Sequence, residues 1–262
     1  MSNILDKIIA NKQMEVKKQK QQISLQLLES KIKDPKEQNS FKEALQRSST
    51  GIIAEFKRRS PSRDWIFKEA KIETVIPSYS RNGASAISVL TDPDFFGGTL
   101  QDLEEASGLT NTPLLRKDFI IDEYQIYQAK AYGADAILLI AAVLTPKETR
   151  ELAMKAKELK LDVLLEIHNE TELGHITDAV DVVGVNNRDL THFITDVKIS
   201  WDMADKIPDD FVKISESGIS STKTVKELQK AGYRGFLMGE NFMKTPDPGK
   251  ALDEFIKELE PK

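Results

Sequence analysis

The sequence predicts a (β/α)8 TIM barrel, a closed α/β barrel, with an N-terminal helical extension. Eight short runs of apolar, largely β-branched residues recur between residues 51 and 238, as strands that are buried on both faces require. Their starts are spaced from 19 residues (163 to 182) to 35 residues (51 to 86), about one strand and one helix per unit. The length of 262 residues is close to the roughly 250 residues typical of this architecture.

The eight predicted strands alternate with segments that carry helix signals. In chain order the strands are 51–56 (GIIAEF), 86–90 (AISVL), 113–116 (PLLR), 135–140 (DAILLI), 163–167 (VLLEI), 182–185 (VVGV), 212–215 (VKIS) and 235–238 (GFLM). Thr145, Pro146 and Glu148 form a helix start, because side chains there satisfy amides that the first turn leaves unpaired. The same scheme is predicted for Asp122 with Gln125 and for Asn169 with Glu172, and helix ends are predicted at Gly83, Gly133 and Gly232. Alternating units with short connections favour a parallel barrel.

Residues 1–50 form the predicted extension, and residues 51–262 form the barrel, within a single domain overall. No Pro/Gly/Ser-rich linker divides the chain. A first helix is indicated by the spacing of Ile4, Leu5, Ile8 and Ile9. The basic stretch that follows is predicted to be a solvated helix face, with contact to RNA or to a membrane as the alternative; it holds Lys12, Lys17, Lys18 and Lys20. A second helix near 40–47 either caps the barrel or reaches its mouth.

Composition excludes several classes of function. Cysteine is absent, which excludes disulfides and thiolate chemistry and fits a reducing cytoplasm. The longest apolar run, 136–144, is far shorter than the roughly 20 residues of a membrane span. The net charge of −5 argues against nucleic acid as the main partner. We expect a cytoplasmic monomer, and we expect the three histidines, which lack metal-ligand spacing, to be ordinary surface or loop residues: His168, His175 and His192.

Polar side chains follow the predicted strands at the points where the strands end. Because these ends meet at one rim of a parallel barrel, the side chains are expected to converge in an active site. Glu55 and Lys57 lie two residues apart on one strand and therefore face the same way. Burying two amines and two carboxylates merely for stability would be costly, so the pattern favours function. The residues at this rim are Glu55, Lys57, Lys117, Glu166, Asn186 and Glu216.

Glycines follow the seventh and eighth predicted strands. Gly218 and Gly239 let backbone amides approach an anion, and in such barrels a phosphate is commonly bound at these two strand ends. The sequence therefore predicts a phosphorylated small-molecule substrate.

Several segments together resemble one enzyme family. They are EFKRRSPS (55–62), SVLTD (88–92), FFGG (95–98), LRKDF (115–119), LEIH (165–168), VNNRDL (185–190) and ESGI (216–219). In this order they are similar to the signature segments of indole-3-glycerol phosphate synthase. The resemblance implies a (β/α)8 barrel with an N-terminal helical segment, a carboxy-lyase of tryptophan biosynthesis without a cofactor. The implied reaction closes 1-(2-carboxyphenylamino)-1-deoxyribulose 5-phosphate to indole-3-glycerol phosphate, with loss of carbon dioxide and water.

The resemblance also implies roles for individual residues. Lys117 is the acid that protonates the developing alkoxide, with a pKa expected to be lowered by burial and by neighbouring cations. Glu166 is the general base, Glu55 orients these groups and shares protons with them, and Lys57, near the substrate carboxylate and phosphate, is a second candidate acid for dehydration. The implied catalytic set is Glu55, Lys57, Lys117, Glu166, Asn186 and Ser217, and the implied substrate-binding set is Ser60, Phe96, Arg188, Glu216, Gly218 and Gly239.

Two departures from the family pattern affect the rim. Asp64 stands where the family usually has a glycine, and Glu240 stands near the predicted phosphate site, where many relatives carry a small hydroxyl residue. Two alternatives stay open from sequence: a noncatalytic barrel that binds a phosphometabolite, and another phosphate-binding barrel enzyme such as an isomerase or a Schiff-base aldolase.

Overall fold

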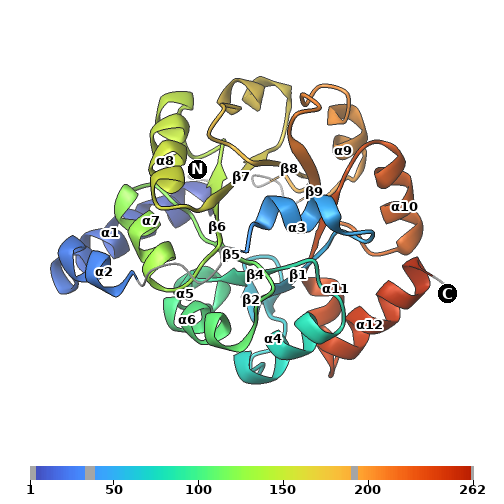
Figure 1. Cartoon of the computed structure of the whole chain (residues 1–262), viewed down its shortest axis with the longest axis horizontal. Helices are drawn as coiled ribbons and strands as arrows, with labels where there is room; N and C mark the ends of the chain where they lie inside the picture. The colour runs from blue at the N-terminus through green and yellow to red at the C-terminus, as the bar shows by residue number, and fades with distance from the viewer. Residues whose placement is uncertain (1–3, 33–38, 190–193, 261–262) are drawn as a thin grey trace.

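The computed structural model describes residues 4–32, 39–189 and 194–260, and it shows a closed parallel barrel ringed by helices (Figure 1). The barrel strands lie in the order β1, β10, β9, β8, β7, β6, β5, β4 around the ring. Their bounds are β1 Ile52–Phe56, β4 Ala86–Leu90, β5 Leu114–Lys117, β6 Ala136–Ile140, β7 Asp162–Ile167, β8 Val182–Asn186, β9 Val212–Glu216 and β10 Gly235–Met238. The predicted fold class is confirmed, and each predicted strand boundary lies within one residue of the observed one.

One small sheet was not predicted from the sequence. After β1 the chain forms a hairpin of β2 (Arg59–Ser60) and β3 (Asp64–Trp65), which pair antiparallel. Two-residue strands that are partly exposed leave no apolar run to detect. The hairpin places the first loop over the mouth of the barrel.

Helices follow the strands and cover the outside of the barrel (Figure 1). They are α4 Ile72–Arg81, α5 Pro93–Phe96, α6 Leu100–Leu109, α7 Glu123–Ala131, α8 Pro146–Glu158, the 3₁₀ helix η1 Glu170–His175, α9 Lys198–Met203, α10 Thr222–Lys230, α11 Glu240–Met243 and α12 Pro248–Leu259. The predicted capping box of Thr145 and Glu148 is confirmed, and the three predicted helix-ending glycines have positive φ. None of the helices within the described ranges is long and apolar enough to cross a membrane.

Two of the predicted helix starts differ from expectation. Asp122 caps α7 by accepting from the amide of Tyr124, but Gln125 bonds Phe119 and Ile121 instead of closing a box. Asn169 caps a 3₁₀ helix rather than an α-helix. Sequence spacing alone cannot distinguish these arrangements, because the competing hydrogen-bond partners belong to the preceding strand end and loop.

Three helices precede the barrel: α1 (Ile4–Gln22), α2 (Leu25–Lys31) and α3 (Phe41–Arg47). Helix α3 lies across the end of the barrel at which the strands begin (Figure 1). Phe41 and Leu45 are fully buried there, in one cluster with the first residues of β4, β6, β8 and β9. Helix α3 therefore caps this end, and the opposite end is left for the site.

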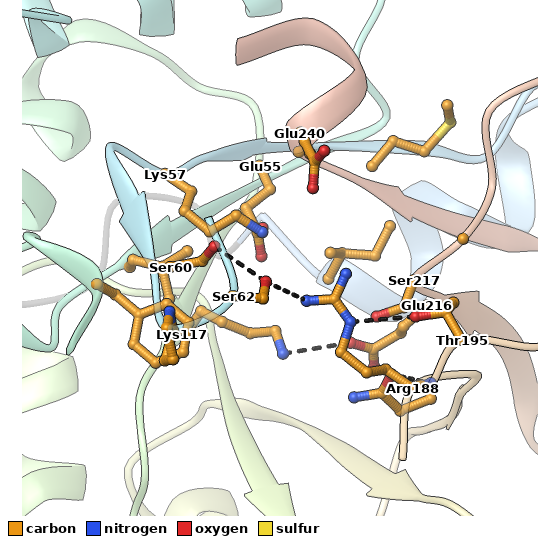
Figure 2. Close-up of a pocket in the computed structure, with 18 of the residues that line it drawn as sticks. Glu55, Lys57, Ser60, Ser62, Lys117, Arg188, Thr195, Glu216, Ser217 and Glu240 are labelled. Carbon is orange, nitrogen blue, oxygen red and sulfur yellow. Dashed lines mark hydrogen bonds and ion pairs between the residues drawn. The ribbon is translucent and has the colours of Figure 1, made fainter. Parts of the chain in front are cut away.

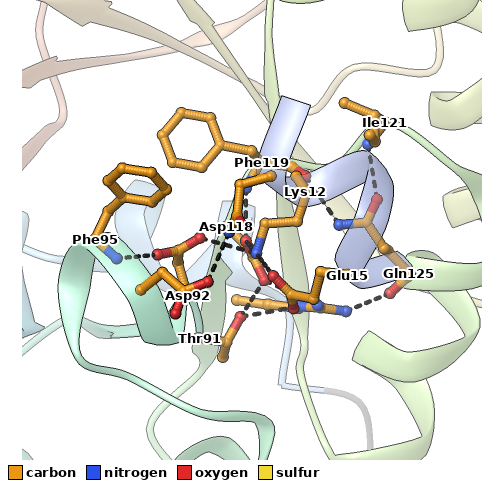
Figure 3. Close-up of polar contacts among 12 residues, drawn as sticks. Lys12, Glu15, Thr91, Asp92, Phe95, Asp118, Phe119, Ile121 and Gln125 are labelled. Atoms are coloured by element: carbon orange, nitrogen blue, oxygen red, sulfur yellow. Dashed lines mark hydrogen bonds and ion pairs between the residues drawn. The ribbon is translucent and has the colours of Figure 1, made fainter. Parts of the chain in front are cut away.

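The prediction that Lys12 lies on a solvated helix face is wrong. Its side chain is fully buried between α1 and the barrel, at the centre of an ionic cluster (Figure 3). The ammonium is 2.9 Å from both Asp92 and Asp118 and 2.7 Å from Glu15. Lys12 follows Ile8 by four residues and precedes Val16 by four, so it continues the buried stripe of α1.

The Lys12 cluster fixes the beginnings of two loops at the barrel mouth, the loop after β4 at Asp92 and the loop after β5 at Asp118. Asp92 also caps α5 through the amide of Phe95, and Asp118 also accepts from the amide of Phe119. Burial alone would lower the pKa of Lys12, but the neighbouring carboxylates outweigh this effect and raise it. Correspondingly, Lys12 and Arg116 outweigh the desolvation of Asp118 and lower the pKa of that carboxyl.

We predict that Lys12→Met destabilises the protein far more than Lys20→Met. Removing one partner of a buried ionic cluster leaves carboxylates uncompensated, which typically costs about 3–5 kcal/mol. Lys20, on the same helix as Lys12, pairs with Asp122 at the start of α7, but the two side chains are 45% and 31% exposed, so its loss should cost less than about 1 kcal/mol. Urea unfolding of the two variants measures the difference, and equal free energies of unfolding would contradict a structural role of the cluster.

Candidate active site

A cavity of about 430 Å³ opens at the barrel end where the strands finish. All of the site residues predicted from sequence line it: Glu55, Lys57, Ser60, Phe96, Lys117, Glu166, Asn186, Arg188, Glu216, Ser217, Gly218 and Gly239. They come from β1, β5, β7, β8 and β9 and from the segments that follow barrel strands, including β2 for Ser60 and α5 for Phe96 (Figure 2). The structure thus brings the whole set together, because parallel strands deliver their carboxyl ends to one rim.

Lys117 lies between two buried carboxylates. Its ammonium is 3.2 Å from Glu166 Oε2 and 3.2 Å from Glu216 Oε2, and both glutamates are almost completely buried. The expectation of a lowered Lys117 pKa is wrong. Desolvation acts in that direction, but the charges of Glu216, Glu166 and Glu55 outweigh it and raise the pKa. Lys117 is therefore a cation among these carboxylates.

The two carboxylates beside Lys117 are not equivalent. Burial raises the pKa of Glu216 to about 7, since the attraction of Lys117 does not offset burial and the like charge of Glu166. The pKa of Glu166 is lowered, because burial is outweighed by Lys117, His168 and a hydrogen bond from Asn186. Oε1 of Glu216 is buried and has no hydrogen-bond partner among the described residues. A proton shared within this pair therefore favours Glu216.

Glu55 and Lys57 form the pair predicted from their spacing, with Glu55 Oε1 2.6 Å from Lys57 Nζ. A Cβ at Gly239 would lie 2.5 Å from this carboxylate oxygen, and a Cβ at Gly184 would lie 2.4 Å from Oε1 of Glu216. Each of these glycines leaves room for a charged side chain of a neighbouring strand. Gly239 thus has a packing reason for being glycine besides any contact with an anion.

The rim beyond β8 and β9 carries hydrogen-bonding groups that reach across the mouth (Figure 2). Arg188 donates to Ser62 of the β2–β3 hairpin at 3.3 Å and to Thr195 at 3.3 Å. Ser217 and Gly218 both have positive φ, and a Cβ at Gly218 would come within 2.6 Å of Thr195. Only glycine fits at position 218, so the turn after β9 brings bare backbone to the cavity.

One wall of the cavity was not predicted from the sequence. The apolar residues at the start of α1, Ile4, Leu5 and Ile8, line it, and so does Phe119, whose ring centroid lies 6.0 Å from that of Phe96. An aromatic pair and an aliphatic wall suit a substrate with an aromatic ring. The helical spacing of the isoleucines was the available signal, but it shows only that one face is buried and not what that face covers.

The three histidines were expected to be ordinary surface or loop residues. His192 lies outside the described residues. His175 is buried rather than on the surface, and it bonds Thr149 at 2.9 Å. His168 follows β7 in a loop, mostly buried, with Nε2 3.5 Å from Glu166 Oε1. Within the described ranges no three acidic or histidine side chains are arranged to hold a metal ion.

The two departures from the family pattern are each paired with an arginine. Asp64 adopts φ 54°, a conformation that favours glycine, and its carboxylate accepts from Arg59 at 2.7 Å. Glu240 Oε1 lies 3.2 Å from Arg63 Nε, so the carboxylate is drawn toward the hairpin (Figure 2). The Arg59–Asp64 pair lies within the hairpin, whereas the Arg63–Glu240 pair links the hairpin to α11.

Comparison with known proteins assigns the chain. A family model described as "Indole-3-glycerol phosphate synthase" matches residues 5–255. The chain belongs to this family. A relative named indole-3-glycerol phosphate synthase from Bacteroides thetaiotaomicron is 54% identical over 260 residues, covering 99% of this chain and 100% of the relative. One of the same name from Alkaliphilus metalliredigens is 43% identical over 253 residues, covering 96% and 97%. The predicted carboxy-lyase of tryptophan biosynthesis, acting on a phosphorylated small molecule, is confirmed.

Solved structures of other proteins support the fold alone. A tryptophan synthase α-subunit mutant from Pyrococcus furiosus matches with a TM-score of 0.61 at 17% identity, covering 80% of this chain and 97% of that one. A thiamine phosphate pyrophosphorylase from the same organism matches with a TM-score of 0.59 at 15% identity, covering 80% and 95%. Identities this low show a shared barrel, so the indole-3-glycerol phosphate synthase assignment rests on the family model and the named relatives.

We predict that Glu216 titrates near pH 7 in the substrate-free protein and that Glu166→Gln lowers its pKa. The substitution removes the like charge that helps to raise it, whereas Lys117 still attracts the ionised form. Carbon-13 NMR of labelled glutamate side chains follows this titration, and Glu216→Gln identifies the signal. A Glu216 pKa that rises or stays constant in Glu166→Gln would show that the two carboxylates are not coupled.

Proposed function

We propose that the Lys117 cluster performs the ring closure of 1-(2-carboxyphenylamino)-1-deoxyribulose 5-phosphate, with Lys117 as general acid and Glu166 as general base. The observation that supports this most strongly is the position of one ammonium 3.2 Å from each of two buried carboxylates, Glu166 and Glu216. The raised pKa of Lys117 and the lowered pKa of Glu166 set the protonation states that the two roles require, an ammonium and a carboxylate, and not the strength of the acid or of the base.

The chemistry places distinct demands on these groups. The anilino ring carbon that bears the carboxylate attacks the ketone, and the developing alkoxide takes a proton from Lys117. Carbon dioxide then leaves, and its bonding electrons restore the aromatic ring. Loss of water requires an acid at the departing hydroxyl and a base at the neighbouring carbon, which is the role we assign to Glu166.

The second lysine supplies the remaining acid. Lys57 lies 2.6 Å from Glu55 on the same rim and is partly exposed. We propose that Lys57 binds the substrate's anionic groups and assists dehydration, and that Glu55 orients it and shares protons. Lys117 pairs with Glu166 and Glu216, whereas Lys57 pairs with Glu55. These separate pairs support separate roles, with Lys117 as the acid of the ring closure and Lys57 acting in the later loss of water.

The other lining residues hold the substrate. We propose that Asn186, Arg188, Glu216 and Ser217 position the sugar hydroxyls and the carboxylate, while Phe96 packs against the aromatic ring. Gly218 and Gly239 present amides to the phosphate, with Ser60 beside them. Their common place in one cavity supports this set.

We further propose that the protein is a cytoplasmic monomer without a cofactor and that nucleic acid is not a partner. The residues of the extension and of the barrel act as one domain in this proposal. The fully buried Lys12 cluster and the capping helix α3, both from the extension, support it.

The first test mixes purified protein with 1-(2-carboxyphenylamino)-1-deoxyribulose 5-phosphate, without metal or cofactor, and follows indole fluorescence. We expect turnover in the wild type and its loss, by at least about 100-fold, in Lys117→Ala and in Glu166→Gln, because general acid–base catalysis typically contributes 10²–10⁴-fold. The control is Lys198→Ala, since Lys198 is an exposed residue in a loose surface pair. Near-normal activity of Lys117→Ala would remove its assignment, and binding without turnover in the wild type would favour a noncatalytic barrel.

We predict that Glu240→Ser lowers the KM for the phosphorylated substrate and that Arg63→Ala raises it. Glu240 places a negative charge beside the proposed phosphate site and occupies Arg63, which is 65% exposed. Exposed pairs are worth about 0.2–1 kcal/mol, so each change should be roughly two- to five-fold with little change in kcat. Steady-state kinetics at low ionic strength measures both, and a higher KM in Glu240→Ser would show that its carboxylate supports binding.

A further inference from the structure

His168 continues the charged cluster beyond Glu166. Glu166 uses one carboxylate oxygen for each of two partners: Oε2 lies 3.2 Å from Lys117 Nζ, and Oε1 lies 3.5 Å from His168 Nε2. The other ring nitrogen of His168, Nδ1, lies 3.3 Å from Glu172 Oε2. A carboxylate, an imidazole and a second carboxylate thus stand in line from η1 to the centre of the barrel.

Glu172 fixes the position of the imidazole. Its Oε2 accepts from the backbone amide of His168 at 2.7 Å, and its Oε1 accepts from Asn169 at 3.1 Å. The ring is mostly buried, and Nε2 has no hydrogen-bond partner among the described residues, so its charged neighbour Glu166 decides what this nitrogen does. A histidine held in this way between two carboxylates is stabilised as a cation.

Glu166 has two cationic neighbours, Lys117 and His168, whereas Glu216 has only Lys117 within ion-pair distance among the described residues. Its Oε2 shares Lys117 with Glu166, but its Oε1 is buried over Gly184 without a hydrogen-bond partner among the described residues. One ammonium carries a single charge against two almost completely buried carboxylates, so a proton retained by one of them lowers the electrostatic cost. The carboxylate with two cationic neighbours is the one that can stay ionised.

We propose that His168, held by Glu172, is a positioning residue that keeps Glu166 ionised and directs the retained proton to Glu216. This inference rests on the proposed role of Glu166 as general base. A base must be ionised before the substrate arrives, and His168 supplies the charge for this without touching the reacting atoms. Of the groups assigned to catalysis, Glu166 is the one that His168 contacts.

The direction of the pH effect follows from the charges around His168. The groups that face it are Glu172 from η1, Glu166 from β7 and Glu216 from β9. These carboxylates outweigh the burial of the ring and raise its pKa, so His168 is cationic on the acidic side of neutrality. That is the range in which Glu166 would otherwise take up a proton. Loss of His168 should therefore raise the pKa of Glu166 and cost activity at low pH, with little cost at high pH.

The test compares pH profiles of kcat/KM for the wild type, His168→Gln, Glu172→Gln and His175→Gln. We expect the acidic limb to move up by about one pH unit in His168→Gln, which lowers activity about ten-fold below the limb while the plateau stays within about two-fold of wild type. Glu172→Gln should move the limb less, in the same direction. His175 is the matched control, because its ring bonds Thr149 and belongs to the same segment. A uniform loss at every pH in His168→Gln, or an equal shift in His175→Gln, would overturn the proposal.

A second measurement separates this inference from the proposed catalytic roles. Nitrogen-15 NMR of labelled histidine, with signals identified by the two histidine variants, gives the pKa of the His168 ring in the substrate-free protein. We expect a pKa above the ordinary value of about 6.5 that falls in Glu166→Gln and in Glu172→Gln. An unshifted ring pKa in the wild type, or one that ignores Glu166→Gln, would refute the coupling itself. If the coupling is found but Glu166→Gln retains full turnover, the base assignment fails and the electrostatic link stands.

Discussion

One lysine facing two buried carboxylates is the constraint on which the rest of the site depends. Lys117 provides a single positive charge for Glu166 and Glu216, so the three groups carry one negative charge in excess when both of these buried carboxylates are ionised. A proton retained on Glu216, whose pKa is raised to about 7, removes this excess. Glu55 is paired with Lys57 at 2.6 Å, and its charge still contributes to raising the pKa values of Lys117 and Glu216. The protonation states of these groups at neutral pH therefore depend on how many charges share the buried site.

The N-terminal extension makes that confined space possible from both ends. Helix α3 inserts Phe41 and Leu45 among the strand starts and excludes water from the end of the barrel opposite the site. At the other end the start of helix α1 forms one wall of the cavity through Ile8, and Lys12 binds the two loop starts. Burial of the charged groups between the strands lowers the local dielectric and strengthens their interactions. The extension is therefore as much a part of the active site as the barrel is.

The sequence was sufficient for the barrel and for the residues that line its mouth, because both follow from local rules. A buried strand needs an apolar run, and a polar residue at its end must face the rim, so Glu55, Lys117 and Glu166 could be placed from their neighbours alone. Lys12 could not be placed in this way. Its burial depends on Asp92 and Asp118, which only the folded barrel brings to it. A lysine without those partners would indeed be solvated.

Neither the direction of the Lys117 pKa shift nor the position of the His168 ring could be predicted from the sequence, for a related reason. Burial and opposite charge act on a lysine pKa in opposite directions, and only the distances decide which prevails. The charges that prevail at Lys117 are carboxylates, and Lys57, the other lysine of the rim, is itself paired with Glu55 at 2.6 Å. Equally, nothing local to His168 says that its ring lies against Glu166 and not in solvent. Pairwise electrostatics across strands is set by three-dimensional distance, and spacing along the chain does not give it.

The end of β5 shows how catalysis and anchoring share one short segment. Lys117 points into the cavity toward Glu166, while Asp118, the next residue, points outward to Lys12 on α1. Successive residues of a strand face opposite sides, so the proposed proton donor and the anchoring carboxylate are placed back to back. The fully buried Arg116 forms a second ion pair with Asp118, at 2.9 Å. The position of the Lys117 ammonium is consequently fixed by two charge clusters at once, and a shift of α1 would be transmitted to the reacting end of the lysine through a single peptide unit.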